Sequence, residues 1–126
     1  MRIFLDANVL VSVLNKEYPH FSFSARIVSL NSNEGYQIFT SPLCLAIAYY
    51  FAEKKSRARH AKEKIALLCE HILIADAGRD AVHETLRNKQ IDDFEDGLEY
   101  YAAMRHKCDC IITENKSDFY FSDIPV

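Results

Sequence analysis

The chain has 126 residues and a mass of 14.5 kDa, with 49% apolar and 26% charged residues, which are the proportions of one ordinary globular domain. This size excludes a two-domain enzyme and predicts a single domain over residues 1–126. The 15 Lys and Arg residues against 18 Asp and Glu residues give a net charge of −3. A uniformly basic nucleic-acid-binding surface is therefore excluded, and any nucleic acid must be bound locally.

The start of the chain lacks the features of an export signal, because Asp6 and Asn8 interrupt its apolar residues and no small-residue cleavage site follows. No segment reaches the roughly 18 apolar residues of a membrane span. The four cysteines form no CxxC pair and have no His at zinc-finger spacing, a pattern typical of buried free thiols. We therefore expect a cytoplasmic protein with no membrane partner.

Short apolar runs in this chain alternate with segments whose apolar residues have helical spacing. The first half of the chain is predicted to contain, in order, a strand at Arg2–Leu5, a helix from Asn8 to near Pro19, a helix at Phe21–Leu30, a strand at Tyr36–Thr40 and a helix opened by Ser41 and Pro42. A helix at Glu53–Lys64 and beyond, a strand at His71–Ala75 and a helix capped by Asp76 and reaching about Asn88 follow. The last predicted elements are a helix at Ile91–His106, a strand at Asp109–Thr113 and a candidate fifth strand at Ile124–Val126. This alternation predicts an α/β fold in which helices cover both faces of a parallel sheet.

Polar residues directly after the predicted strands are the first candidates for a site, because ligands of open parallel sheets bind beyond the carboxyl ends of the strands. Asp6 and Asn8 follow the first strand. Thr113, Asn115 and Asp118 follow the fourth. We therefore expect these residues to lie near one another at one edge of the sheet.

The helix that leads into the fourth strand begins with an acidic cluster, made of Asp92, Asp93, Glu95, Asp96 and Glu99. Its apolar face is expected to consist of Phe94, Leu98, Tyr101 and Ala102. Taken singly, such carboxylates are explained by helix capping, which is one hypothesis for all of them. Together at one sheet edge, and without basic neighbours, they would repel one another unless a cation neutralised them. Asp and Asn oxygens suit Mg²⁺ or Mn²⁺, and a zinc site of Cys or His is not indicated.

Residues 53–64 have the opposite character, with six basic and two acidic residues. Within this segment Lys54, Lys55, Arg57 and Arg59 are candidate contacts to the phosphates of RNA. A solvated helix face is the alternative interpretation, because acidic residues are interspersed among the basic ones.

Several segments of the chain, in their order and spacing, resemble the PIN-domain family, and particularly the VapC-like ribonuclease toxins of toxin–antitoxin pairs. The segments are RIFLDANVL, TSPLCLAIAYYF, DDFEDGLEYYAAMRHKCDCIITENKSDF and FSDIPV. The resemblance implies a three-layer α/β/α fold with a central, mostly parallel sheet of four or five strands. It further implies an acidic site for Mg²⁺ or Mn²⁺, cleavage of RNA, a small antitoxin-like partner protein and a homodimer.

The resemblance also assigns roles to individual residues. Asp6, Asp96 and Asp118 match acidic positions of the family and are the expected catalytic residues and metal ligands, with Asn115 as a further metal contact. Asp118 is expected either to bind the ion or to orient the attacking water as a base. Three neighbouring residues are expected to support these ligands or to replace one of them, namely Asn8, Asp93 and Thr113.

One acidic position of the family has no carboxylate in this chain. By register it falls at Ile47 or at the neighbouring Ala46, and neither side chain binds a metal ion. Glu53 lies nearly two helical turns further on, about 9 to 10 Å along the axis, too far to replace it directly. Three hypotheses therefore stand. The first is a metal-dependent endoribonuclease, and the second is a catalytically degenerate PIN domain that binds RNA or a protein partner without cleavage. A module whose acids only cap helices is the third.

Overall fold

The computed structural model describes residues 1–126 and contains one sheet of four strands in the order β3-β2-β1-β4. The strands are β1 (Arg2–Leu5), β2 (Gln37–Thr40), β3 (Leu73–Ile74) and β4 (Cys110–Ile112). All three pairs of neighbouring strands are parallel. Phe4 of β1 lies opposite Phe39 of β2 on one side and Ile111 of β4 on the other. The predicted α/β class is confirmed.

Six α-helices and one short 3₁₀ turn lie between the strands, and a second 3₁₀ turn follows β4. These are α1 (Ala7–Leu14), α2 (Phe21–Ser29), η1 (Leu30–Ser32), α3 (Pro42–Lys55), α4 (Ala58–Cys69), α5 (Arg79–Arg87), α6 (Phe94–Arg105) and η2 (Lys116–Phe119). None of the helices is both long enough and apolar enough to cross a membrane.

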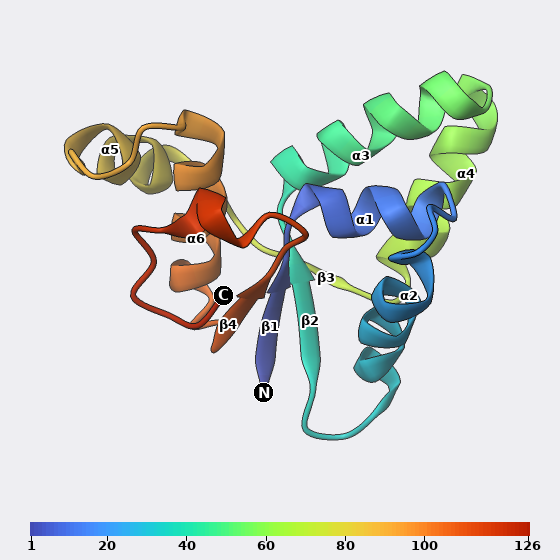
Figure 1. Ribbon diagram of the computed structural model, residues 1–126, viewed down its shortest axis with the longest axis horizontal. Helices are drawn as coiled ribbons and strands as arrows, with labels where there is room; N and C mark the ends of the chain where they lie inside the picture. The colour runs from blue at the N-terminus through green and yellow to red at the C-terminus, as the bar shows by residue number, and fades with distance from the viewer.

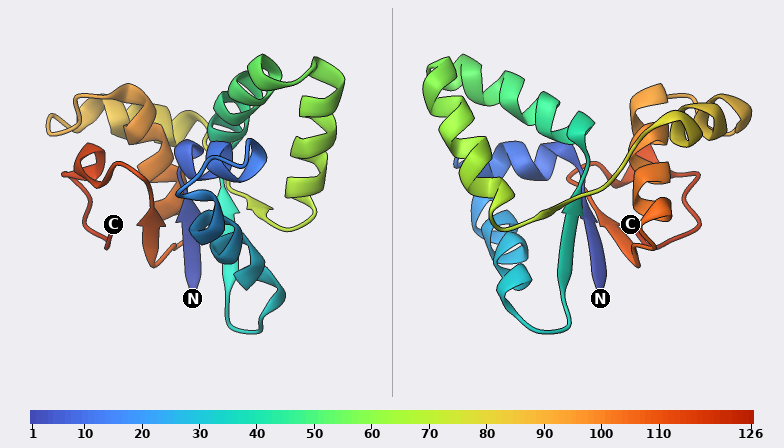
Figure 2. Two further views of the ribbon diagram at one scale, coloured as in Figure 1. Left: turned by 45° about the vertical axis from the view of Figure 1, so that its right-hand side comes forward. Right: turned by 180° about the vertical axis from the view of Figure 1, so that it is seen from behind.

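The order of the strands determines which side of the sheet each helix covers. The chain moves from β1 to β2 to β3 in one direction and then returns past β1 to β4. Because parallel crossovers are right-handed, this change of direction transfers the later helices to the opposite face. Accordingly α1 to α4 lie on one side of the strands, and α5 and α6 lie on the other (Figures 1 and 2). The result is an α/β/α arrangement.

The same change of direction leaves a crevice between β1 and β4, at the carboxyl ends of the two strands. The backbone amide of Asp6 donates to the carbonyl oxygen of Ile112 at 3.0 Å, so the two strands remain paired up to this point. In Figure 1 the carboxyl end of β1 leads directly into α1, and that of β2 leads into α3. Residues that follow β1, β2 and β4 are thereby gathered at one end of the sheet.

A single apolar cluster of 23 buried residues holds the sheet and the helices together. Phe4, Leu5, Leu10 and Ile38 are completely buried within it. Each such side chain stabilises the fold by about 1.5 to 3 kcal/mol relative to exposure, so the apolar strand runs account for the position of the sheet. The polar residues at the strand ends are consequently held on a rigid support.

The predicted fifth strand is wrong. Ile124–Val126 has no strand structure, and it approaches the sheet through one backbone hydrogen bond, from the amide of Ile111 to the carbonyl oxygen of Pro125 at 3.0 Å. Pro125 has no amide hydrogen and cannot extend the pairing into a ladder. The sheet therefore ends at β4.

Three predicted helix starts also differ from the structure. The helix expected from Glu53 begins at Ala58, because residues 53–55 complete α3. The helix expected from Asp76 begins only after Gly78, and the amide of Asp76 instead donates to Nε2 of His106, the C-cap of α6, at 2.9 Å. The helix expected from Ile91 begins at Phe94, after Asp93 has capped it. These differences shorten the helices without changing the order of the elements.

Candidate metal centre

Asp6 is fixed in place by the ends of two strands. It follows β1 and caps α1, with its Oδ1 accepting a hydrogen bond from the amide of Ala7 at 2.6 Å. Its Oδ2 accepts from the hydroxyl of Thr113, which follows β4, at 2.7 Å. The side-chain amide of Asn8 donates to the same hydroxyl at 3.1 Å. Thr113 and Asn8 thus orient the side chain of Asp6.

Asp6 lies in a pocket of about 390 Å³ at this end of the sheet. Seven of its lining residues carry carboxyl groups, and these are Asp6, Glu17, Glu95, Asp96, Glu99, Glu114 and Asp118. The remaining lining residues are Ala7, Asn8, Val11, Ile47 and Phe51. No Lys, Arg or His lines the pocket. The three residues predicted to be catalytic, Asp6, Asp96 and Asp118, are therefore brought together, and nothing in the pocket neutralises them.

The pKa of Asp96 shows how closely these carboxylates interact. Partial burial, followed by the negative charges of Asp93, Asp118, Asp6 and Glu95, raises the pKa of Asp96 to about 7. The pKa of Glu95 is also raised, chiefly by burial and then by the charge of Asp93. A cation in the pocket would reverse the effect of these charges.

Of the other predicted residues, Thr113 contacts Asp6 without lining the pocket, and neither Asn115 nor Asp93 lines it. Asn115 is exposed, and its side-chain oxygen accepts a hydrogen bond from the hydroxyl of Ser117 at 2.9 Å. Its amide donates to Thr113 at 3.0 Å, and its carbonyl oxygen accepts from the amide of Asp118 at 3.1 Å. The structure therefore places Asn115 as a turn residue that leads into η2 and positions Asp118.

Asp93 is likewise exposed, and it acts as the N-cap of α6. Its Oδ1 accepts a hydrogen bond from the amide of Asp96 at 3.0 Å. Because the cap fixes where the helix starts, it also fixes the direction in which Asp96 points. Its negative charge acts on Asp96 from outside the pocket.

Sequence reasoning named Glu99 within the acidic cluster but did not assign it to the site. In the structure Glu99 is 1% exposed, and it lines the pocket together with Asp6. Burial, followed by a hydrogen bond with Asp6 and by the negative charge of Asp6, raises the pKa of Glu99 to about 10. The available signal was its position three residues after Asp96, which puts both carboxyl groups on one side of α6.

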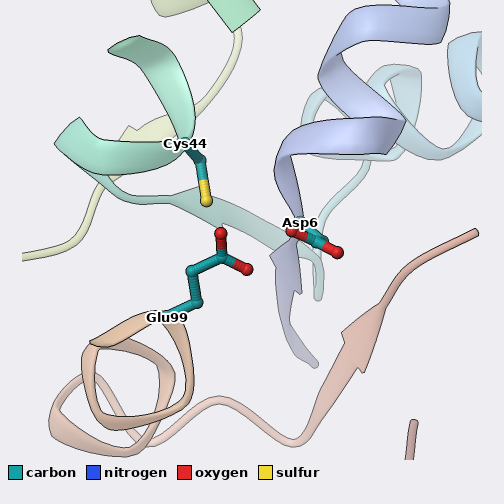
Figure 3. Close-up of side chains that lie close together, drawn as sticks. All are labelled: Asp6, Cys44 and Glu99. Atoms are coloured by element: carbon teal, nitrogen blue, oxygen red, sulfur yellow. The ribbon is translucent and has the colours of Figure 1, made fainter. Parts of the chain in front are cut away.

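Glu99 belongs to a buried group of three potential donors with Asp6 and Cys44. One donor atom of each residue lies within 4.8 Å of the others. Figure 3 shows the Glu99 carboxyl group between the thiol of Cys44, on α3, and the side chain of Asp6. Burial, and then the charge of Glu99, raises the pKa of Cys44 well above its usual range.

Helix α3 contributes no carboxylate to the pocket. Its N-cap is Ser41, whose hydroxyl oxygen accepts from the amide of Cys44 at 3.1 Å. From this start, Ile47 and Phe51 are one turn apart and line the pocket. The position at which the family resemblance predicts an acidic residue therefore faces the other acids with an apolar side chain.

The four basic residues expected to contact RNA lie at the far end of α3 and at the start of α4, outside the pocket. All of them are exposed, namely Lys54, Lys55, Arg57 and Arg59. Lys54 lies over the ring of Tyr50, with its Nζ 4.4 Å from the ring centre. Lys55 donates to the carbonyl oxygen of Asn15. Arg59 forms a 3.4 Å ion pair with Glu63.

A second hollow, of about 800 Å³, lies where α5 packs against α6. It contains both signs of charge, and Arg105 pairs with Asp80 there at 3.3 Å. The uncompensated negative charge is thus a particular property of the pocket at the carboxyl ends of β1 and β4.

Comparison with known protein families identifies the class of protein to which this fold and its acidic pocket belong. A family model described as the PIN domain matches residues 2–117. The chain therefore belongs to the PIN-domain family. Among curated proteins it is similar to Ribonuclease VapC1 from Aquifex aeolicus (strain VF5), with 26% identity over 128 residues covering 99% of this chain and 88% of the relative.

Solved structures of VapC toxins have the same fold. Mycobacterium tuberculosis VapC20, a Sarcin-Ricin loop cleaving toxin, gives a TM-score of 0.75 at 14% identity, with 98% of each chain covered. VapBC2 from Rickettsia felis, bound to a DNA fragment from its promoter, gives 0.72 at 20% identity, covering 100% of this chain and 96% of that one. VapBC-1 from nontypeable Haemophilus influenzae gives 0.67 at 16% identity, with 99% and 96% covered.

Proposed function

We propose that this chain is a metal-dependent endoribonuclease that hydrolyses RNA phosphodiester bonds, and that it is the toxin component of a toxin–antitoxin pair. The observation that carries the proposal is the pocket lined by seven carboxyl groups and by no basic side chain. Such a concentration of negative charge is stable at neutral pH only when protons or cations offset it. Membership of the PIN-domain family and similarity to a VapC ribonuclease support this activity.

The residues of the pocket fit a hard divalent cation. Every ionisable donor that lines it is a carboxyl oxygen, the donor that Mg²⁺ and Mn²⁺ prefer. Asp6, Asp96 and Asp118 would hold the ion, coming from the end of β1, the start of α6 and η2. Bound there, Mg²⁺ or Mn²⁺ would activate water and offset the charge of the phosphate oxygens.

The protein's own part in the reaction is to position these groups. Asp6 is held by two hydrogen bonds of 2.6 and 2.7 Å, which leaves it little freedom to rotate. Asp118 is only half-buried and reaches the pocket from η2, so it serves as a ligand or as the base that takes a proton from the attacking water. Asp96 is pre-oriented by its capping residue, Asp93.

RNA binding is assigned to the basic end of α3 and the start of α4. Phe51 lines the pocket, and Lys54 and Lys55 follow it by one helical turn on the same helix. A phosphate backbone that enters the pocket would therefore pass these lysines, Arg57 and Arg59. Replacing Lys54 and Lys55 by Gln should weaken RNA binding and reduce its dependence on salt concentration, while Mn²⁺ affinity stays unchanged.

A small antitoxin-like protein is the proposed partner, because two of the similar structures are of VapBC complexes. The proposed assembly of the chain alone is a homodimer. Light scattering on the purified protein tests this assembly, since a homodimer has twice the mass of 14.5 kDa.

The second candidate function is a degenerate PIN domain that binds RNA or a protein without cleaving RNA, and the apolar Ile47 in the pocket favours it. The deciding experiment incubates the purified protein with RNA and Mn²⁺. The proposed activity predicts cleavage that both EDTA and Asp96→Asn abolish. Cleavage that survives Asp96→Asn would overturn the assigned mechanism, and calorimetry without any Mn²⁺ binding would favour the degenerate domain.

A further inference from the structure

The part of the pocket bounded by α3 contains an acid that the expected site does not use. The family position on α3 is apolar: from this helix Ile47 and Phe51 line the pocket, and the thiol of Cys44 lies within 4.8 Å of Asp6 and Glu99. Glu99 enters the same space from the opposite helix, α6, with its carboxyl group beside Cys44 and Asp6 (Figure 3). A carboxyl group is thus present where α3 lacks one, although it comes from a different element.

The contacts of Glu99 with Asp6 and Cys44 leave one of its carboxyl oxygens without a hydrogen-bond partner. Its side chain is 1% exposed, and its Oε2 is buried without a hydrogen-bond partner. No Lys, Arg or His lines the pocket to pair with it. A buried polar atom without a partner is destabilising, and native proteins rarely keep one unless it serves a ligand or a reaction. The unpartnered oxygen belongs to a residue that itself lines the acidic pocket, which points to a cation.

We propose that Glu99 is a metal ligand, which pairs with Asp6 at the inner end of the pocket and supplies from α6 the carboxylate that α3 lacks. This inference rests on the proposed metal-dependent function. Asp96 lies three residues before Glu99 on α6, so one helix presents two carboxylates to the same ion. Cys44 is a soft sulfur donor that Mg²⁺ and Mn²⁺ disfavour, so it is not assigned as a ligand.

Mn²⁺ binding to the full chain, followed by calorimetry and by the loss of the free Mn²⁺ signal in electron paramagnetic resonance, tests the proposal without measuring activity. Glu99→Gln keeps the size of the side chain and removes the carboxyl group that would ionise to bind the metal ion. We expect it to lower Mn²⁺ affinity by about tenfold or more. Glu95→Gln is the matched control, because Glu95 is an exposed acid on the same helix that also lines the pocket, and it should change the affinity much less.

A rescue variant separates the loss of a ligand from structural damage. Adding Ile47→Glu to Glu99→Gln returns a carboxylate to the inner end of the pocket from α3, and it should recover most of the lost Mn²⁺ affinity. Urea unfolding of each variant confirms that it is folded.

The outcomes distinguish this inference from the proposed function. If the wild type binds Mn²⁺ and Asp96→Asn weakens binding, but Glu99→Gln leaves the affinity within about twofold, Glu99 is not a ligand and the function still stands. If Glu99→Gln and Glu95→Gln weaken binding equally, the effect is one of general charge, and the inference is also wrong. If the wild type binds no Mn²⁺, both the inference and the metal-dependent function fail.

Discussion

The buried carboxyl group of Glu99 should make the stability of the metal-free protein depend on pH in a way that one substitution removes. Its pKa is raised from an ordinary value near 4.5 to about 10, mainly by burial. The folded protein therefore keeps a proton that the unfolded chain releases. The stabilisation from this proton is complete below pH 4.5 and is lost progressively as the pH rises toward 10. Glu99→Gln resembles the protonated form, so it should retain that stabilisation at neutral pH.

The size of the effect follows from proton counting. One proton bound in the folded state and absent in the unfolded state changes the free energy of unfolding by about 1.4 kcal/mol per pH unit. Between pH 6 and pH 8 the contribution of Glu99 should fall by about 2.7 kcal/mol. Asp96 adds its own pH dependence below about pH 7, but it does so in both proteins. The difference between wild type and Glu99→Gln therefore isolates Glu99.

The measurement is urea unfolding of both proteins at several pH values in EDTA, so that no divalent cation competes with protons. Glu84→Gln serves as the control, because Glu84 is an exposed glutamate on α5. We expect the free energy of unfolding of the Glu99→Gln protein to increase steadily, relative to that of the wild type, from pH 6 to pH 8. The difference in this free energy between the Glu84→Gln control and the wild type should stay constant. If the free energy of unfolding changes with pH by the same amount in all three proteins, Glu99 is not a buried, protonated group and the reasoning is refuted.

Three further substitutions test other parts of the structure. Ile47→Glu should tighten Mn²⁺ binding measured by calorimetry, because Ile47 faces the acidic pocket, and unchanged or weaker binding would contradict that register. Thr113→Val should lower the free energy of urea unfolding by about 2 kcal/mol, because it removes the hydroxyl that donates to Asp6 at 2.7 Å, and an effect near zero would mean that this bond is not stabilising. Gly97→Ala should also destabilise the protein by about 2 kcal/mol, because the new Cβ would lie 2.3 Å from Cγ2 of Thr85, and a fully stable variant would show that α5 and α6 can separate there.

The arrangement of the sheet and most of the site could be predicted because they depend on local signals. Apolar runs locate the strands, and the rule for parallel sheets then selects the residues directly after them, so Asp6, Thr113 and Asp118 were found together. Asn115 follows the same strand but lies outside the pocket. The number of residues between the strand end and Asn115 does not indicate that the hydroxyl of Ser117 donates to the side-chain oxygen of Asn115. This local hydrogen bond holds the Asn115 side chain in the loop.

Glu99 was harder to predict because its orientation depends on how α6 is rotated about its own axis. The apolar pattern predicted a buried face that includes Phe94, but Phe94 is 46% exposed, and the buried residues instead include Gly97 and Tyr100. Gly97 has no side chain and so allows α6 to approach Thr85 of α5 closely. With α6 packed in this way, Glu99 points into the protein while Asp96 remains at the pocket. The close packing at Gly97 thus accompanies a rotation of α6 that buries Glu99, a residue that the apolar pattern leaves off the buried face.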